Sequence, residues 1–388
     1  MRIDRNLFSY EMPTKIIYGT GAVVMAGQEI QRLGANKVLL TTDQGIKGAG
    51  LLNPVTSALA KAGIDWVVYD QVEADSDVNI VAEATSMAQE NQCNCVLGIG
   101  GGSSMDTAKA VAVMSTNPGS IYDYVGLDQV KNDPLPIVAI PTTAGTGSEV
   151  TIWAVISDKK KQLKTGIGSI KMMPDLAICD PELTLSLPPL LTAETGMDAL
   201  THAIESYVNT ATQPISEALA EKSIKMIAEH LRLAVANGED IEARDGMLMG
   251  SLTAALAFNE TRLGIAHAWS SPLGAYFSIS HGLANAILLP NVMEFNLIGA
   301  PDKYAKIADL MGENISGLSI MEAAAKSVEA VRKLLIDIEL PRHFRAIIDI
   351  EEEDIIKLAE EALKSGNNLV NPHRPDLDDL IAICKKSL

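Results

Sequence analysis

Four residues in the second half of the chain have the types and spacings expected of metal ligands. Asp198 and His202 are four positions apart in ETGMDALTHAIESY, so on a helix they share one face and can chelate one ion. His267 and His281 are fourteen positions apart, and on one straight helix they would lie roughly 21 Å apart. Because metal–nitrogen bonds are about 2 Å long, these two histidines can share an ion only if the chain folds back between them.

The segment between the two histidines contains residues that permit such a turn. Pro272 and Gly274 are poor residues for the middle of a helix, and we expect the helix to break near them. His281-Gly282 can then start or end a neighbouring helix. The sequence thus predicts one carboxylate and three imidazoles, a set that suits Fe(II) or Zn(II) better than Mg²⁺ or Ca²⁺. Four protein ligands also describe a closed structural zinc site, so the spacing leaves both uses of the metal open.

The other three histidines lie in charged or proline-flanked contexts and are interpreted as surface or structural residues: His230, His343 and His373.

A glycine-rich loop in the first half has the features of an anion site. CVLGIGGGSSMDTAK, residues 95–109, consists of an apolar strand-like run, three consecutive glycines and a helical pattern. Ser103 followed by Asp106 is interpreted as a capping box that fixes the start of this helix. Backbone amides at a helix N-terminus suit a diphosphate, although a tight turn would need the same glycines. The glycine spacing differs from the usual dinucleotide-binding pattern.

Two further segments offer groups that suit a nucleotide. Asp43 ends a strand-like run in LLTTDQG, where it could accept hydrogen bonds from ribose hydroxyls and repel a 2′-phosphate, or simply act as a turn or cap residue. IPTTAGTGSEV, residues 140–150, places hydroxyls around two glycines after another strand. These hydroxyls suit a ribose or carboxamide, and a solvated turn is the alternative.

Short apolar runs alternate with helical patterns through the first half, which predicts a parallel sheet covered by helices. After Asp180-Pro181, Ala, Leu, Met, Glu and Lys recur at helical spacing with no convincing strand. We therefore expect an α/β domain over residues 1–184 and an all-helical domain over residues 185–388. The expected strands are Lys37–Thr42, Asp65–Tyr69, Cys95–Ile99, Ile137–Ile140, Ile152–Ser157 and Leu176–Cys179, with a β-hairpin over Ile152–Gly168 added to the sheet.

Composition excludes several classes of partner. The 388 residues carry a net charge of −18, and the longest basic cluster is Lys159-Lys160-Lys161. This argues against nucleic acid and anionic membranes as partners. No signal peptide or long apolar run is visible, and Cys93 and Cys95 are interpreted as reduced core residues. We expect a cytoplasmic protein.

Four motifs together resemble one family: GGGSSMDTAK, PTTAGTGSEVT, GMDALTHAIESY and GIAHA…LGA…HG are similar to the iron-containing, group III alcohol dehydrogenases. That family includes lactaldehyde reductases, 1,3-propanediol dehydrogenases and butanol dehydrogenases. The resemblance runs from about residue 8 to the C-terminus. It implies a dehydroquinate synthase-like plan, in which a Rossmann-like dinucleotide-binding domain precedes a helical metal-binding domain.

The resemblance also implies roles for individual residues. Asp198, His202, His267 and His281 match the ligands of Fe(II), or sometimes Zn(II), and Phe258 matches a residue of the substrate pocket. The positions that match cofactor-binding residues, with Asp43 implying NAD over NADP, are Asp43, Gly101, Gly102, Ser103, Thr142, Thr143, Thr146, Thr151, Lys164 and Leu183.

The sequence departs from the family at Ser271, where many members have a histidine four positions after the third metal ligand. A serine can relay a proton or contact substrate but cannot titrate near neutral pH, so the catalytic acid–base group stays unassigned.

The motifs and the resemblance together predict an NAD(H)-dependent alcohol dehydrogenase or aldehyde reductase for a small primary alcohol or diol. The resemblance also implies a homodimer or larger homo-oligomer. The alternatives are a glycerol dehydrogenase-like or dehydroquinate synthase-like metalloenzyme, and a non-catalytic nucleotide-binding protein.

Overall fold

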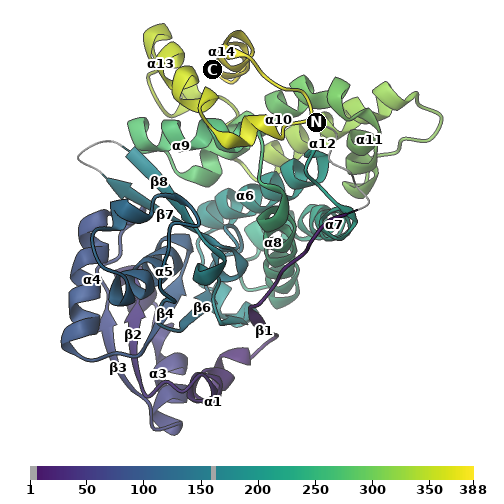
Figure 1. Cartoon of the computed structure of the whole chain (residues 1–388). Coiled ribbons are helices and arrows are strands. Elements are labelled where there is room, and N and C mark those ends of the chain that lie inside the picture. Colours follow the sequence, from purple (N-terminus) through teal and green to yellow (C-terminus); the bar gives the residue numbers. More distant parts are fainter. Residues whose placement is uncertain (1–6, 159–162) are drawn as a thin grey trace. The chain divides into compact units, whose positions relative to one another are not determined.

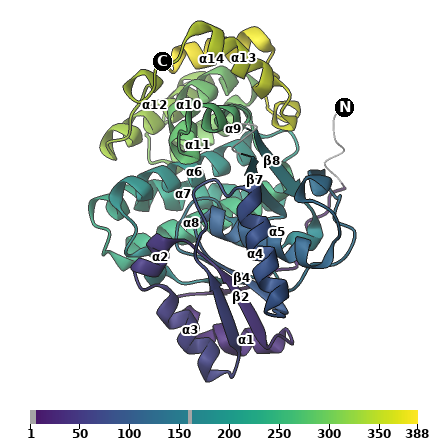
Figure 2. The same cartoon turned by 90° about the vertical axis from the view of Figure 1, so that its left-hand side faces the viewer.

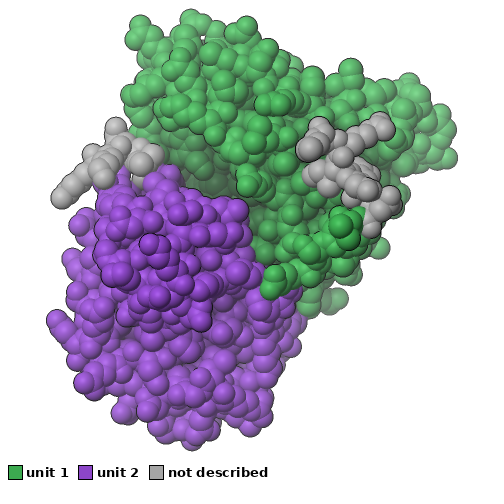
Figure 3. Space-filling model, in the orientation of Figure 1, with its two compact units in different colours: residues 1–11, 188–388 green, residues 12–187 purple. Residues whose placement is uncertain are grey.

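The computed structural model describes residues 7–158 and 163–388. The basic cluster Lys159-Lys160-Lys161 and most of the charged turn of the predicted hairpin lie outside the described residues. The chain forms two compact units, which Figure 3 distinguishes by colour. Met12–Leu187 form an α/β unit, and residues 7–11 join Pro188–Leu388 in a helical unit.

The α/β unit contains a six-stranded sheet in the order β1-β9-β6-β4-β2-β3, and every pairing in it is parallel. This confirms the predicted parallel sheet. The sequence analysis missed the short edge strand β1. The strands of this sheet are β1 (Lys15–Tyr18), β2 (Lys37–Thr41), β3 (Asp65–Tyr69), β4 (Cys95–Gly100), β6 (Ile137–Pro141) and β9 (Leu176–Cys179).

Side chains alternate between the two faces of the sheet, and each face has its own core. In β2, Leu39 packs into one core while Val38 and Leu40 pack into the other. Helices α4 and α5 cover the first face, and η1, α1 and α3 cover the second (Figures 1 and 2). The helices of this unit are α1 (Ala26–Arg32), α2 (Gln44–Gly48), α3 (Leu52–Lys61), α4 (Val78–Glu90) and α5 (Gly102–Thr116); its 3₁₀ turns are η1 (Ala22–Met25), η2 (Ile121–Tyr124), η3 (Ser148–Val150), η4 (Ile170–Met172) and η5 (Pro181–Thr184).

The predicted hairpin forms, but it does not extend the large sheet. Strands β7 (Trp153–Asp158) and β8 (Leu163–Gly168) pair antiparallel, and β8 also pairs with the short strand β5 (Gly126–Leu127). They make a separate three-stranded sheet. Ala154, Ile156 and Ile167 pack into the core that contains α5, so the apolar side of the hairpin is buried without pairing to the large sheet.

The helical unit has no strand among its described residues, as predicted. Its main elements are helices that follow one another along the chain (Figure 1). They are α6 (Pro189–Val208), α7 (Pro214–Ala236), α8 (Ile241–Thr261), α9 (Ile265–Phe277), α10 (His281–Asn296), α11 (Pro301–Leu310), α12 (Ile320–Asp337), α13 (Glu352–Leu363) and α14 (Leu377–Lys386), with the 3₁₀ turns η6 (Leu297–Gly299), η7 (Phe344–Ala346) and η8 (Gly366–Leu369).

The chain turns between His267 and His281, but later than the sequence predicts. Helix α9 continues through Pro272 and Gly274 and ends at Phe277. Ser278 then adopts a left-handed conformation with φ 57°, and Ser280 caps α10, whose first residue is His281. Trp269 and Leu273 are fully buried on α9, and this packing offsets the roughly 3 kcal/mol that an internal proline costs a helix.

Among the described residues, none of the helices combines the length and apolarity needed to span a membrane. Cys93 and Cys95 are buried free thiols, as predicted.

Candidate metal centre and cofactor loops

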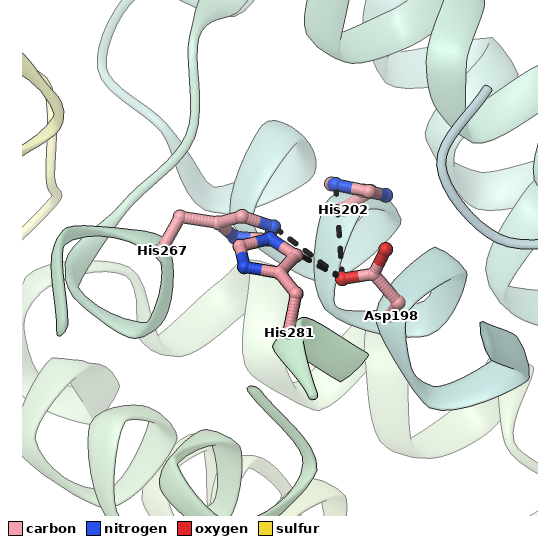
Figure 4. A group of neighbouring side chains, drawn as sticks. All are labelled: Asp198, His202, His267 and His281. Atoms are coloured by element: carbon pink, nitrogen blue, oxygen red, sulfur yellow. Dashed lines mark ion pairs between the residues drawn. The ribbon is translucent and has the colours of Figure 1, made fainter. Parts of the chain in front are cut away.

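Asp198, His202, His267 and His281 come together in the helical unit, where one ligand atom from each lies within 4.8 Å of the others. Asp198 Oδ1 lies 3.7 Å from the Nε2 atoms of His267 and His281 and 4.0 Å from Nε2 of His202. Figure 4 shows the three imidazoles directed toward this carboxylate. Ligands bonded at 2.0–2.2 Å in a tetrahedron lie about 3.3–3.6 Å apart. The four residues therefore fit a metal such as iron or zinc after small movements.

Three helices position the cluster. Asp198 and His202 lie one turn apart on α6, whereas His267 comes from the first turn of α9 and His281 begins α10. Gly282 makes the close approach of α10 to α6 possible. A Cβ at this position would lie 2.3 Å from the carbonyl oxygen of Glu194, which is shorter than any tolerated contact.

Glu205 fixes the orientation of His267. Its carboxylate lies 2.6 Å from His267 Nδ1 and accepts hydrogen bonds from the backbone N–H groups of Gly264 and Ala266. A proton shared between Nδ1 and Glu205 leaves Nε2 as the nitrogen that faces Asp198. Metal-binding histidines commonly have such a carboxylate partner, which fixes the tautomer and the ring.

The charges of the cluster shift its pKa values. Burial raises the pKa of Asp198, but the neighbouring histidines lower it, and the balance lies well below the usual range for an aspartate. Burial lowers the pKa of His267, whereas Glu205 and Asp198 raise it to about 9. The buried carboxylate therefore stays ionised and attracts positive charge to this point.

The two residues that the sequence analysis connected with the substrate, Phe258 and Ser271, are close in sequence to the ligand His267. Phe258 on α8 is buried, and its ring stacks on His202 with 4.5 Å between centroids. Ser271 lies on α9 one turn after His267 and is exposed. The remaining histidines lie outside the cluster; His373, for example, stacks on Phe295.

In the α/β unit, the predicted cofactor loops lie where the strand order reverses. β3 lies on one side of β2 and β4 on the other, and α3 and α4 cover opposite faces. Ligands of open parallel sheets bind beyond the carboxyl ends of strands at such a point. Asp43 follows β2 and Gly100 ends β4, so both lie at this edge.

Asp43 and the glycine loop are close together. Asp43 Oδ1 accepts a hydrogen bond from Ile46 N and caps α2, while Oδ2 lies 3.7 Å from the position that a Cβ on Gly100 would occupy. Gly100 has φ +147°, a conformation that favours glycine. Asp43 is therefore a helix cap, as one interpretation of the sequence held, with its second oxygen near the glycine loop.

The predicted capping box at Ser103 and Asp106 is wrong. Helix α5 begins at Gly102, and its cap is Gly101, which has no side chain to donate or accept. Asp106 instead accepts hydrogen bonds from Ser148 Oγ and Val155 N. Contacts with η3 and β7 thus replace the local cap.

The threonine loop, residues 140–150, lies against the glycine loop around Gly100, Gly101 and Gly102. Gly101 faces Thr143, with a Cβ position 3.4 Å from Thr143 Cγ2, and Gly102 faces Thr146 even more closely, at 2.8 Å. Thr142 Oγ1 is buried and has no hydrogen-bond partner among the described residues. A side chain at position 102 would collide with Thr146, so glycine there lets the two loops pack closely, and the buried Thr142 hydroxyl is a polar group for a ligand. The loops therefore fit a dinucleotide.

Ser103 and Lys164 are connected through Asp75, which the sequence analysis did not single out. Ser103 Oγ accepts a hydrogen bond from Asp75 N, and Lys164 Nζ lies 2.7 Å from Asp75 Oδ1. Lys164 is thereby held near the start of α5. Leu183 packs into the core on the α1 and α3 face of the sheet, and its predicted contact with a cofactor stays a prediction.

Thr151 belongs to a buried ionisable cluster that sequence reasoning missed. Lys109 Nζ donates to the carbonyl oxygens of Thr151 and Trp153, at 2.8 Å each. Burial lowers the pKa of Lys109 to about 8, while Asp106 and Glu149 raise it. Burial also raises the pKa of Glu149 to about 7 and that of Asp106 above its usual value. Lys109 thus ties α5 to the end of the threonine loop.

The comparisons with known proteins agree with both halves of the chain. The family model "Iron-containing alcohol dehydrogenase" matches residues 13–181, and "Fe-containing alcohol dehydrogenase family, C-terminal" matches residues 192–388. The chain is 39% identical to 1,3-propanediol dehydrogenase of Klebsiella pneumoniae over 98% of its length and 99% of the relative. It is 39% identical to NAD-dependent methanol dehydrogenase of Bacillus methanolicus over 98% and 100%. A crystal structure of 1,3-propanediol oxidoreductase superposes with a TM-score of 0.96, at 40% identity, covering 98% of this chain and 100% of that one.

Proposed function

Because the chain belongs to the iron-containing alcohol dehydrogenase family, we propose that it is an NAD(H)-dependent dehydrogenase of a small primary alcohol or diol, which also reduces the corresponding aldehyde. The observation that carries this proposal is the convergence of Asp198, His202, His267 and His281 within 4.8 Å. The relatives named as 1,3-propanediol and methanol dehydrogenases support small alcohols as the substrate class.

These four residues would hold Fe(II), with Zn(II) as the alternative, and the choice of iron rests on the name of the family. A bound metal of this kind supplies a Lewis acid for the alcohol or carbonyl oxygen. Glu205 keeps His267 Nε2 directed into the site, and the buried ring of Phe258 stacks on His202. A serine hydroxyl does not ionise near neutral pH, so Ser271 would take part in proton transfer only as a hydrogen-bond donor and acceptor.

The cofactor would be held by the loops at the carboxyl edge of the sheet. The N-terminal amides of α5 around Gly101, Gly102 and Ser103 suit a diphosphate. The threonine loop offers hydroxyl groups, including the unpartnered Thr142 Oγ1, and Asp43 Oδ2 favours a ribose with free hydroxyls. When bound, NAD supplies the hydride acceptor or donor.

The direct test is oxidation of NADH by anaerobically purified protein with a panel of short aldehydes. Turnover should require added Fe(II) or Zn(II) and disappear with a chelator. Failure to bind either a metal or NADH would contradict the proposal. Metal loading and NADH binding without turnover on any short aldehyde or diol would contradict the substrate class alone.

Asp43→Gly tests the choice of NAD. Removing the carboxylate removes its repulsion of a 2′-phosphate, so kcat/KM with NADPH should rise by roughly tenfold or more while kcat/KM with NADH falls. Lys47→Ala, which changes an exposed neighbour on α2, is the matched control. An unchanged ratio of the two cofactors in the Asp43 variant would remove Asp43 from the ribose site.

Three further parts of this proposal come from the sequence analysis. The cytoplasmic location and the division into domains at residues 184 and 185 rest on composition and patterning, and assembly as a homodimer or larger homo-oligomer rests on the family resemblance.

A further inference from the structure

The amide of Asn285 lies against three of the four residues of the candidate metal centre. Its Nδ2 atom is 2.8 Å from Asp198 Oδ1, 3.1 Å from His267 Nε2 and 3.2 Å from His281 Nε2. These are three of the four atoms that would bind the metal. Because Nδ2 is nearly equidistant from these three atoms, it lies near the axis that passes through the middle of the three. The NH₂ group therefore faces the space between the ligand atoms.

The amide has little else to hold it in place. Asn285 is fully buried, and its Oδ1 has no hydrogen-bond partner among the described residues. The NH₂ group has two hydrogens but three neighbouring ligand atoms, so it cannot make a well-aligned bond to each of them. The carboxylate of Asp198 only accepts hydrogen bonds, which keeps the NH₂ side of the amide turned toward the cluster.

The position of Asn285 in the chain explains how it reaches the cluster. It lies four residues after His281 on α10, so both side chains project from the same face of that helix. The residue thereby reaches His267 on α9 and Asp198 on α6 as well.

We propose that the side chain of Asn285 competes with the metal. Its NH₂ group hydrogen-bonds to the ligand atoms when no metal is bound, and it must turn away for a cation to enter. An N–H donor and a cation cannot face the same ligand atoms at these distances. By linkage, bonds that exist only in the metal-free state lower the affinity for metal. Asn285 is thus a positioning residue that keeps the ligands together and makes the metal exchangeable. This inference rests on the four ligands binding a metal, as in the proposed function.

The test compares Asn285→Ala with the wild type, using Zn(II) alone as the probe. The dissociation constant is measured by competition with a chromophoric chelator, and thermal unfolding is followed with and without Zn(II). We expect Asn285→Ala to bind Zn(II) more tightly, on the order of tenfold, which corresponds to the loss of one or two hydrogen bonds. Its metal-free form should unfold at a lower temperature than the wild type, and Zn(II) should recover most of the difference.

Asn296→Ala is the matched control, because Asn296 is also a buried amide on α10 but bonds to Asn371 instead of the cluster. It should lower the unfolding temperature equally with and without Zn(II) and leave the dissociation constant unchanged. Asn285→Ser, whose shorter side chain cannot reach the three ligand atoms, replaces Asn285→Ala if that variant does not fold.

Two outcomes would overturn the inference while leaving the metal centre intact. Weaker Zn(II) binding by the Asn285 variants would make the residue a support of the metal-bound form, and unchanged binding would show that its amide does not compete. If the wild type itself binds no Zn(II) or Fe(II), the proposed metal centre fails, and the inference fails with it.

Discussion

The helical unit and the α/β unit each bury a group of ionisable side chains, and the two groups obtain their positive charge differently. In the α/β unit, Asp106 and Glu149 lie near the ammonium group of Lys109, and that lysine also donates to backbone carbonyls. In the helical unit, Asp198 forms ion pairs only with histidines among the described residues. The first group is built around the ammonium group of a lysine of the chain, whereas the second consists of a carboxylate and three imidazoles, whose atoms can also bind a metal ion.

This difference separates a structural role from a metal-binding role. Burying a charge is costly unless it is paired. Lys109 meets that requirement within the chain and fixes the loop that ends at Thr151. In the centre around Asp198 the charge is paired with histidines and with the Asn285 amide, and the same side chains have the atoms that bind iron or zinc. Both clusters contain buried carboxylates, but only the arrangement around Asp198 suits a metal ion.

Removing one of the four candidate metal ligands should have the largest effect, because only the cluster around Asp198 is expected to bind metal. His267→Ala removes one of four ligand atoms together with the group that Glu205 orients. We expect metal content to fall to background and kcat/KM to fall by at least about 10³-fold, measured by metal analysis and NADH oxidation. His373→Ala, a histidine outside the cluster, should leave both unchanged. A His267 variant that remains metal-loaded and active would remove this residue from the ligand set.

Lys109→Met should show that the second cluster depends on its own cation. The change leaves the buried carboxylates of Asp106 and Glu149 without a neighbouring ammonium, which costs about 3–5 kcal/mol of stability. Urea unfolding of the metal-loaded protein measures this loss, and metal content per folded chain should stay the same. Lys171→Met, whose partner Asp133 is exposed, should cost less than about 1 kcal/mol. Equal losses in the two variants would contradict the role given to Lys109.

Glu149 should make stability fall as pH rises. Its pKa is raised from 4.5 to about 7 in the folded chain, so between these values the folded state binds more protons than the unfolded state. Stability attributable to this group is therefore highest below pH 4.5 and decreases up to about pH 7, by roughly 3 kcal/mol. Unfolding free energies at pH 5 and pH 8 should differ less in Glu149→Gln than in the wild type. Parallel pH profiles would mean that Glu149 does not titrate in this range.

The elements that the sequence predicted well are those encoded locally. The six expected strands form because β-branched and apolar residues cluster between helical patterns, and Asp198 and His202 share a helix face because they are four residues apart. Errors arose where distant contacts decide the outcome. Asp106 bonds to Ser148 and Val155 instead of capping its own helix, and the packing of α9 carries that helix past Pro272.

Glu205 and Asn285, which contact the candidate metal ligands, were also missed by the sequence analysis because their contacts are mostly distant in the chain. Glu205 is 62 positions from His267, and no local pattern connects them. A signal was nevertheless present: Glu205 lies three residues after His202 and seven after Asp198, on the same face of α6, and Asn285 lies four after His281. Polar residues continuing the face of a known ligand are therefore candidates for positioning it.

Glu205→Gln should give the smallest of these effects. It tests whether the negative charge next to His267 contributes to metal binding. The glutamine side chain would keep the volume and could still accept a hydrogen bond from one backbone N–H, but it would lose the charge that holds the Nδ1 proton of His267. Metal affinity should fall by about 10–100-fold without being abolished, measured as a Zn(II) dissociation constant. Glu221→Gln, which removes a carboxylate bonded to Tyr207, is the control and should not change the affinity. If Glu205→Gln binds Zn(II) as tightly as the wild type, His267 is oriented by packing alone, and the negative charge next to it serves the fold and not the metal.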